Sequence, residues 1–388
     1  MFLPQDYFMY HPLPNPTAQQ LQHSAALSER IALRIQQAPS HVISFSDYME
    51  LALYTPELGY YMSEQAIFGK EGDFITAPEI SPLFAQCLAR PCAQVLEKTH
   101  GNILEIGAGS GKLAAELLRS LPELPKNYFI YEISPALRRR QQLYLQQTIP
   151  DIYPRIHWLD ELPKQFTGVI IANEVIDALP TDCFAITENQ ILGRGVTQKD
   201  QQFVWENYLP TEELQNAVKE IQNTLDIPMF PDYTSEISLR LSAWLKELST
   251  CLQSGVILLM DYGFERHEFY HPERSEGTLM CHYRQHAHDN PFWHPGLQDI
   301  TVNVDFTRVA EEAIKNNLEV LGFSAQAHFL LACGLFDIFQ AKPELTYALK
   351  QQIHWLTSPA EMGERFKVMA LAKQCDIPLL GFQEYLAL

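Results

Sequence analysis

The stretch Ile103-Leu-Glu-Ile-Gly-Ala-Gly-Ser-Gly111 is an apolar strand pattern that runs directly into a glycine turn. Glycines at alternate positions allow positive φ angles, and their missing side chains let a ligand lie against the backbone. The residues after Gly111 have helical spacing, so the stretch predicts a strand, a tight turn and a helix in succession. In open parallel sheets, ligands bind beyond the carboxyl ends of such strands.

Two common nucleotide-binding motifs do not fit this turn. A nicotinamide-binding fingerprint, G-x-G-x-x-G, would need glycine at position 112, where Lys112 stands. A P-loop ends in G-K-[ST], but here Leu113 follows the lysine. The spacing E-x-G-x-G-x-G from Glu105 to Gly111 instead resembles motif I of the class I methyltransferases, which bind S-adenosylmethionine.

The motif I resemblance implies that Glu105 helps to hold the amino-acid end of that cofactor. It also implies that the turn residues lie against the cofactor, namely Gly107, Ala108, Gly109 and Gly111. Glu132 ends the next predicted strand, where a carboxylate accepts hydrogen bonds from ribose hydroxyls, although NAD is held in the same way. Asp160 follows the third strand, and it either meets the adenine amino group or caps the following turn.

The fourth predicted strand leads into Asn173-Glu-Val-Ile-Asp-Ala-Leu-Pro180, which we expect to face the methyl group. Asn173 is a predicted cofactor contact, and Glu174 and Asp177 are the predicted catalytic acids. Two carboxylates hold an arginine guanidinium bidentately and draw its charge away from the attacking nitrogen. Such orientation contributes roughly 7–11 kcal/mol to catalysis. Asp177 has an alternative role as the cap of a helix that opens there.

Several ordered motifs together resemble one methyltransferase family. The motifs are Gly72–Ser81, the turn at 105–111, Asn173–Pro180, Asp261-Tyr-Gly263, Gly277-Thr-Leu279, Asp299–Thr307 and Met362–Phe366. They are similar to those of the MidA-like family, which includes a mitochondrial complex I assembly factor that methylates arginine. The resemblance implies protein arginine N-methylation, with a respiratory complex I subunit as the family's known substrate. The N-terminal residues carry no presequence pattern, which suggests a bacterial member and a cytoplasmic location.

The resemblance also assigns the loop 55–81 to the active site. Asp73, Thr76 and Pro78 are then expected beside the cofactor, with Glu79 near them. The competing interpretation is that Glu79 and its neighbours only cap the helix that begins at Pro82.

Composition limits the partners. The chain has 47 acidic and 28 basic residues and a formal net charge of −19, which disfavours a nucleic acid and favours a basic partner or simply solubility. Seven scattered cysteines indicate reduced thiols rather than a disulfide framework. No apolar run approaches the roughly 20 residues that span a bilayer, so we expect no membrane insertion.

Alternating strands and helices predict an α/β protein with a Rossmann-like, seven-stranded, mostly parallel sheet, as in class I methyltransferases. We expect a helical N-terminal extension, two core halves and an insertion that provides a substrate or dimerisation surface for a homodimer. Their ranges are 1–100 with the loop 55–81, 101–182 with the cofactor site, 183–254 for the insertion, and 255–388 with a substrate loop 263–304. Helices are expected over 47–54 (capped by Ser46), 236–252 and 306–321, and a strand over 323–329.

Six histidines lie between 267 and 294, close in sequence to Cys281 and Asp289. Imidazole and thiolate are zinc ligands, but the spacing matches no known ligand frame, so we expect no metal. A substrate-recognition loop is the favoured interpretation, with Tyr283, Phe292 and Trp293 packing on a peptide. Two functional alternatives remain: methylation of another nitrogen, in glutamine or a small amine, and a non-catalytic, cofactor-binding assembly chaperone.

Overall fold

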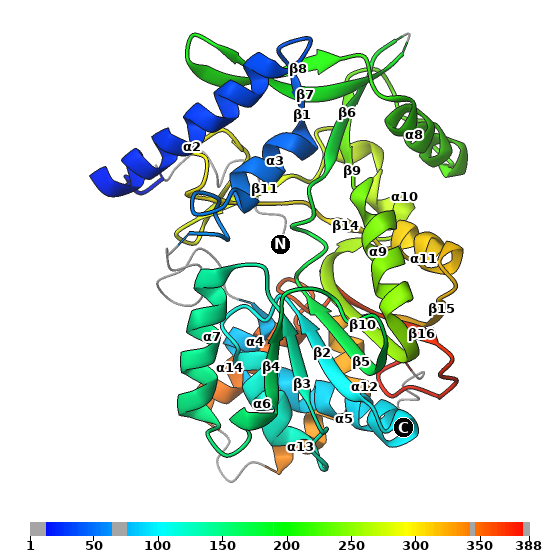
Figure 1. The fold of residues 1–388 in the computed structure, drawn as a ribbon. Coiled ribbons are helices and arrows are strands. Elements are labelled where there is room, and N and C mark those ends of the chain that lie inside the picture. Colours follow the sequence, from blue (N-terminus) through cyan, green and yellow to red (C-terminus); the bar gives the residue numbers. More distant parts are fainter. Residues whose placement is uncertain (1–12, 64–75, 189, 342–345, 383–388) are drawn as a thin grey trace.

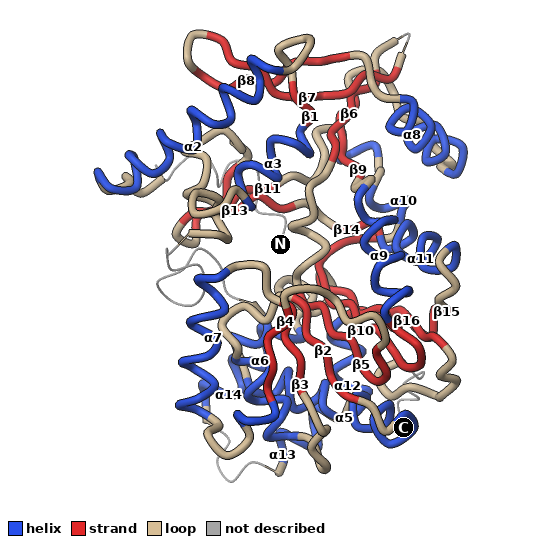
Figure 2. Tube along the Cα trace, in the orientation of Figure 1, coloured by secondary structure: helices blue, strands red, loops and turns tan. Residues whose placement is uncertain are grey.

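The computed structural model describes residues 13–63, 76–188, 190–341 and 346–382. They form two lobes, a lower one built on a large sheet and an upper one built on two smaller sheets (Figure 1). Figure 2 shows that helices flank the large sheet, whereas the upper lobe carries long antiparallel strands.

The large sheet has the strand order β15-β16-β10-β5-β2-β3-β4. The strands from β10 to β4 are parallel, and β16 alone runs antiparallel to both of its neighbours. Their bounds are β2 Asn102–Ile106, β3 Tyr128–Tyr131, β4 Ile156–Leu159, β5 Phe166–Asn173, β10 Leu252–Phe264, β15 Glu319–Ala325 and β16 Phe366–Lys373, and β14 (Val304–Asp305) adds to β10. The predicted seven-stranded, mostly parallel sheet is therefore confirmed.

Helices bury both faces of this sheet because successive strand residues point to opposite sides. Ile103 packs in the cluster that includes side chains of α5 and α6, whereas Leu104 packs in the cluster that includes α9 and α11. The helices are α5 Pro82–Thr99, α6 Lys112–Ser120, α7 Pro135–Thr148, α9 Arg240–Cys251, α11 Phe306–Lys315, α12 Gln326–Ala332, α13 Leu335–Gln340 and α14 Tyr347–Thr357. Because both faces of the sheet are covered, its strands are apolar on both sides and do not alternate apolar with polar residues.

The upper lobe joins the N-terminal extension to the insertion. Ile43 of β1 lies opposite Val196 of β7, so a strand from the extension completes the insertion's antiparallel sheet, β1-β7-β6-β9 with β8 on β7. The elements are α2 Ala18–Gln37, β1 Ile43–Ser44, α3 Phe45–Tyr54, β6 Asp182–Ile186, β7 Ile191–Lys199, β8 Gln202–Tyr208, α8 Glu212–Thr224 and β9 Tyr233–Ile237.

The predicted loop 263–304 is largely ordered secondary structure. It contains a three-stranded antiparallel sheet in the order β12-β11-β13. The bounds are α10 Arg266–Phe269, the 3-10 turn η2 Pro272–Arg274, β11 Met280–Tyr283, β12 His286–His288 and β13 Asp299–Thr301; elsewhere lie η1 Tyr153–Arg155 and α4 Ala77–Ile80. Cys281 and Ile300 pack in the same core cluster as residues of α2 and α3. This sheet therefore belongs to the upper lobe.

Four element predictions were wrong in their details. The strand expected over 323–329 lies four residues earlier, as β15 Glu319–Ala325, and α12 already begins at Gln326. Ser44, not Ser46, caps α3, because its side chain accepts the Asp47 N–H. The helix expected over 236–252 begins later, as α9 at Arg240, because Glu236 and Ile237 end the strand β9, which pairs with β6. The helix expected over 306–321 ends at Lys315, and Asn317 in a left-handed conformation turns the chain into β15. No helix in the described ranges is both long and apolar enough to cross a bilayer.

The buried carboxylate of Glu236 ties the insertion to the segment before β11. It accepts the N–H of Thr278 at 3.0 and 3.1 Å and that of Leu279 at 3.3 Å. The chain reaches this carboxylate only because Gly277 has no side chain: its φ is +85°, and a Cβ would lie 2.0 Å from Glu236 Oε1. The glycine of the Gly277-Thr-Leu279 motif thus allows close packing between these two segments.

Gly277→Ala should destabilise the protein more than Gly111→Ala. Both positions have φ +85°, which costs an alanine roughly 1–2 kcal/mol. At Gly277 the methyl group also displaces a buried carboxylate from its N–H donors, adding on the order of 1–3 kcal/mol, whereas at Gly111 the nearest atom lies at 3.4 Å. Equal losses of unfolding free energy in urea would contradict this explanation of the motif.

Candidate active site

A cavity of about 1160 Å³ lies between the two lobes. Its floor is formed by the loops that follow β2, β3 and β5, at the carboxyl ends of the parallel strands. Its other walls come from several elements, among them α3, α4, α9, β10, β11, β13 and β16. The topology therefore gathers residues from all seven sequence motifs around one space.

The glycine turn forms one wall of this cavity. Gly107 and Gly109 have φ values of +66° and +54°, and the Gly107 N–H donates to the Tyr131 carbonyl at 3.0 Å. A Cβ on Gly107 would lie 3.3 Å from a methyl of Val175, so a larger side chain at this position would also fill the space beside the glycine turn. Ala108 lines the cavity with these two glycines, whereas Gly111 lies outside it and is the N-cap residue of α6.

Two acids flank the turn. Glu105 is buried on β2 and accepts the Tyr128 hydroxyl at 2.7 Å, and burial raises the pKa of this carboxyl to about 7. Glu132 follows β3 and accepts the Ser134 N–H at 2.9 Å and the Gln141 amide at 3.0 Å. Gln141 also donates to the Gly109 carbonyl at 3.0 Å, so one amide ties this acid to the glycine turn.

The short helix α4 lies across the same turn. Its Glu79 accepts hydrogen bonds from Ser110 and from the Lys112 ammonium, one on each carboxylate oxygen. Thr76 and Pro78 line the cavity, whereas Asp73 lies outside the described residues. Ser81 caps α5 by accepting the Leu83 N–H at 3.2 Å, so Glu79 is not merely a helix cap.

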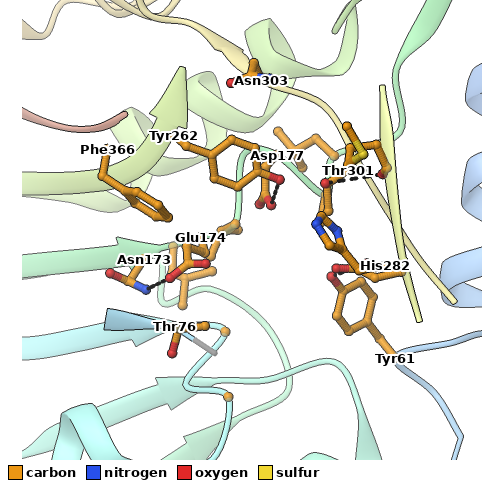
Figure 3. Close-up of a pocket in the computed structure, with 18 of the residues that line it drawn as sticks. Tyr61, Thr76, Asn173, Glu174, Asp177, Tyr262, His282, Thr301, Asn303 and Phe366 are labelled. Carbon is orange, nitrogen blue, oxygen red and sulfur yellow. Dashed lines mark hydrogen bonds between the residues drawn. The ribbon is translucent and has the colours of Figure 1, made fainter. Parts of the chain in front are cut away.

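Glu174 faces the cavity from the end of β5, beside Asn173 (Figure 3). It has a left-handed backbone, φ +53°, and its N–H donates to the Met260 carbonyl at 2.8 Å. Asn173 donates to its carboxylate at 3.2 Å. Burial, followed by the negative charge of Asp177, raises the pKa of Glu174 to about 8.

Asp261 determines the shape of the loop that carries both predicted catalytic acids. It is fully buried at the end of the neighbouring strand β10. Its carboxylate accepts the backbone N–H groups of Ile176 at 2.9 Å and Asp177 at 3.2 Å. Its other oxygen accepts the Tyr262 N–H at 2.9 Å. Asp261 is a positioning residue that the sequence marked only as part of a motif.

Asp177 lies opposite Tyr262 and does not cap a helix, because the chain here forms a turn. Its Oδ2 accepts the Tyr262 hydroxyl at 2.8 Å. Its Oδ1 has no hydrogen-bond partner among the described residues, although the side chain is only 5% exposed. Burial raises the pKa of this carboxyl to about 6. A buried acceptor of this kind is costly unless a ligand supplies a donor.

Sequence reasoning missed the aromatic residues of the upper wall. Tyr54 and Tyr61 stack at 5.6 Å; the first hydroxyl donates to the Ala178 carbonyl at 2.9 Å and the second to Asp299 at 2.8 Å. His282 of β11 also lines the cavity, and burial lowers its pKa to about 4. Asp299 belongs to a quoted motif, but nothing in the motif's spacing indicated that it faces Glu174 across a cavity.

Two expectations need correction. Asp160 does not line the cavity; its side chain is 90% exposed and pairs with Arg138 at 2.6 Å. The aromatics predicted to pack on a peptide do not line the cavity and contact other aromatic rings: Tyr283 lies 4.6 Å from Trp293 between ring centroids, and Phe292 lies 5.0 Å from Trp205. Among the described residues, no three His, Cys, Asp or Glu side chains gather as metal ligands.

Known proteins share both the sequence pattern and this architecture. A family model described as "Putative S-adenosyl-L-methionine-dependent methyltransferase" matches residues 87–324. The Drosophila melanogaster mitochondrial protein arginine methyltransferase NDUFAF7 homolog is 28% identical over 96% of this chain and 93% of its own. The human protein arginine methyltransferase NDUFAF7 is 26% identical over 85% and 80%.

A Burkholderia thailandensis protein bound to S-adenosyl-homocysteine has a solved structure that superposes with a TM-score of 0.90. It is 39% identical and covers 96% of this chain and 98% of its own. A native crystal structure from the same organism gives a TM-score of 0.87 at the same identity and coverage. By its sequence and its fold, this chain belongs to the S-adenosyl-L-methionine-dependent methyltransferase family that the model describes.

Proposed function

We propose that this enzyme transfers a methyl group from S-adenosylmethionine to a guanidinium nitrogen of an arginine in a protein substrate. The observation that carries the proposal is that Oδ1 of buried Asp177, beside Glu174 and the glycine turn, has no hydrogen-bond partner in the described part of the chain. The relatives named as protein arginine methyltransferases support it at 25–28% identity. The family resemblance makes a respiratory complex subunit the first protein to test.

The residues around the glycine turn fit the cofactor. Gly107, Ala108 and Gly109 offer backbone that a ligand can approach, and Glu132 has a carboxylate fixed at the place that suits ribose hydroxyls. Glu105 suits the amino-acid end, and the remaining contacts proposed on the same cavity wall are Asn173, Thr76 and Pro78. Bound there, the cofactor supplies a methyl carbon that its positive sulfur activates. The protein's task is then to align the acceptor nitrogen with it.

The acidic side of the cavity favours a cationic acceptor. Burial raises the pKa of both Glu174 and Asp177, and the negative charge of Asp177 raises that of Glu174 further. A cation bound beside them would stabilise the charged form of both acids. A guanidinium brings that charge together with five N–H donors in a plane, including one for Asp177 Oδ1. A neutral acceptor such as glutamine would leave the carboxylates uncompensated. This difference favours arginine over the uncharged alternatives.

Glu132→Ala should weaken binding of S-adenosyl-homocysteine by about tenfold or more, because two ribose hydroxyls lose a charged acceptor. A tenfold loss of affinity corresponds to roughly 1.4 kcal/mol of binding free energy. Isothermal titration of the full chain measures this. Asp160→Ala is the matched control, because Asp160 is exposed and outside the cavity, and it should bind normally. Equal affinity in wild type and the Glu132 variant would exclude the assigned role.

Glu174→Gln should lower the rate of methyl transfer by about a hundredfold or more, while cofactor affinity stays near that of wild type. The test incubates a lysate of a deletion strain with the protein and tritiated cofactor, then locates the label by mass spectrometry. Label on arginine that disappears with the variant supports the proposal. Label on another residue type, or an unimpaired variant, contradicts it.

The same variant provides an independent readout in the ligand-free protein. The pKa of Glu174 is about 8 in the folded state, above the ordinary value of 4.5 that applies to the unfolded chain. Between these two pH values the unfolded chain ionises this acid and the folded protein does not, so the protein loses stability as pH rises. Glu174→Gln should therefore raise unfolding free energy near pH 8 by on the order of 1 kcal/mol, with less effect at pH 5.

A further inference from the structure

We propose that the acceptor guanidinium is clamped from two sides, and that Asp299 and His282 form the second side and make the site selective for arginine. This inference rests on the proposed function. The first side is Glu174 and Asp177, on the loops of the large sheet. The second side is formed by Asp299 and His282, on β13 and β11 of the upper lobe, and the proposed function gives these two residues no role.

The strand register directs the two residues into the cavity together. His282 of β11 lies directly opposite Asp299 of β13, and Met280 lies opposite Thr301. All four line the cavity, whereas Cys281 and Ile300, one residue away, are fully buried on the other face. Opposite residues on antiparallel strands have Cβ atoms roughly 4.5–5.5 Å apart. The sheet therefore presents an acid and an imidazole as a pair.

Asp299 is held in a fixed orientation. Only 3% of its surface is exposed, and its Oδ1 accepts the Tyr61 hydroxyl at 2.8 Å and the Ile300 N–H at 3.0 Å. Its negative charge contributes to the raised pKa of Glu174 on the other side of the cavity. The two sides thus act electrostatically on one shared space, where a single cation would interact with both.

His282 lies near Tyr61 and Thr301 and extends toward the region of Asp177 (Figure 3). Burial keeps this imidazole neutral, since its pKa falls to about 4, so it does not repel a cation. A neutral imidazole has one nitrogen that accepts a hydrogen bond. Beside Asp299, it offers an acceptor for the guanidinium edge that faces away from Glu174.

Two facing sets of acceptors suit arginine better than lysine. A guanidinium presents donors around a plane, so opposite edges can bind opposite walls at once. An ammonium concentrates three donors at one point and cannot extend to both walls in the same way. Discrimination would therefore depend on the upper wall, while the lower wall would attract either cation.

The test titrates full-length protein, saturated with S-adenosyl-homocysteine, with Nα-acetyl-arginine methylamide. The probes for comparison are the lysine analogue and the citrulline analogue, in which a neutral urea replaces the guanidinium. Wild type should prefer the arginine probe to both. Asp299→Asn, which keeps an oxygen for Tyr61 and Ile300, should weaken arginine binding about tenfold and leave S-adenosyl-homocysteine affinity unchanged.

Two further comparisons separate this pairing from general effects. Asp289→Asn removes the same charge from an exposed position on the same segment, so arginine binding should be unaffected. His282→Leu should weaken arginine binding, whereas His282→Gln, which retains an acceptor, should preserve most of it. If Asp299→Asn and His282→Leu bind arginine as wild type does while Glu174→Gln does not, the two-sided clamp is wrong and the proposed function survives. If wild type does not prefer arginine to citrulline, both are contradicted.

Discussion

The hydrogen bonds from the Ile176 and Asp177 N–H groups to the buried carboxylate of Asp261 are the interaction on which the active site depends. They connect the end of β10 to the loop after β5, two neighbouring parallel strands of the large sheet. Without them, two backbone donors would lack partners in the interior, and the loop would lose its turn. The positions of Glu174 and Asp177 therefore follow from a third acid that does not itself line the cavity.

This arrangement concentrates negative charge in a buried place. Glu174, Asp177 and Asp261 all have a raised pKa because burial disfavours their ionisation, and at Glu174 and Asp261 the neighbouring acids add to this effect. Functional sites commonly carry such a cost, which a bound ligand relieves. Here the relief would come from a cation. The acidic cluster is the reason for proposing a guanidinium rather than a neutral amide as the acceptor.

The sequence predicted the lower lobe well, because its signals are local. Ile103–Gly111 shows a strand, a turn and a helix within a short span, and the apolar run in β5 has the composition of a buried parallel strand. The acids at the strand ends, Glu105, Glu132 and Glu174, follow from the same geometry, and the structure brings them to one cavity. Asp160 also follows a strand of the sheet, but its side chain pairs with Arg138 and does not line the cavity.

The upper lobe could not be derived in this way, because its contacts join residues far apart in the chain. Nothing local indicates that Ile43 pairs with Val196, or that Tyr61 donates to Asp299. Similarly, Gly277 was recognisable as part of a motif, but the reason for a glycine there is the Glu236 carboxylate packed against it. Glu236 lies in the strand β9, whereas the sequence predicted it at the start of a helix over 236–252. Tertiary pairing overrode the local helical preference there.

The central claim is that the buried carboxylates bind a guanidinium. Its most direct test is the pH dependence of arginine binding. Protein saturated with S-adenosyl-homocysteine would be titrated with Nα-acetyl-arginine methylamide from about pH 6 to about pH 9, a range in which arginine stays charged. Affinity should rise with pH as Asp177, with a pKa of about 6, and then Glu174, with a pKa of about 8, ionise. The neutral citrulline probe should show no such rise. An affinity for the arginine probe that is flat or falls across this range would contradict the account.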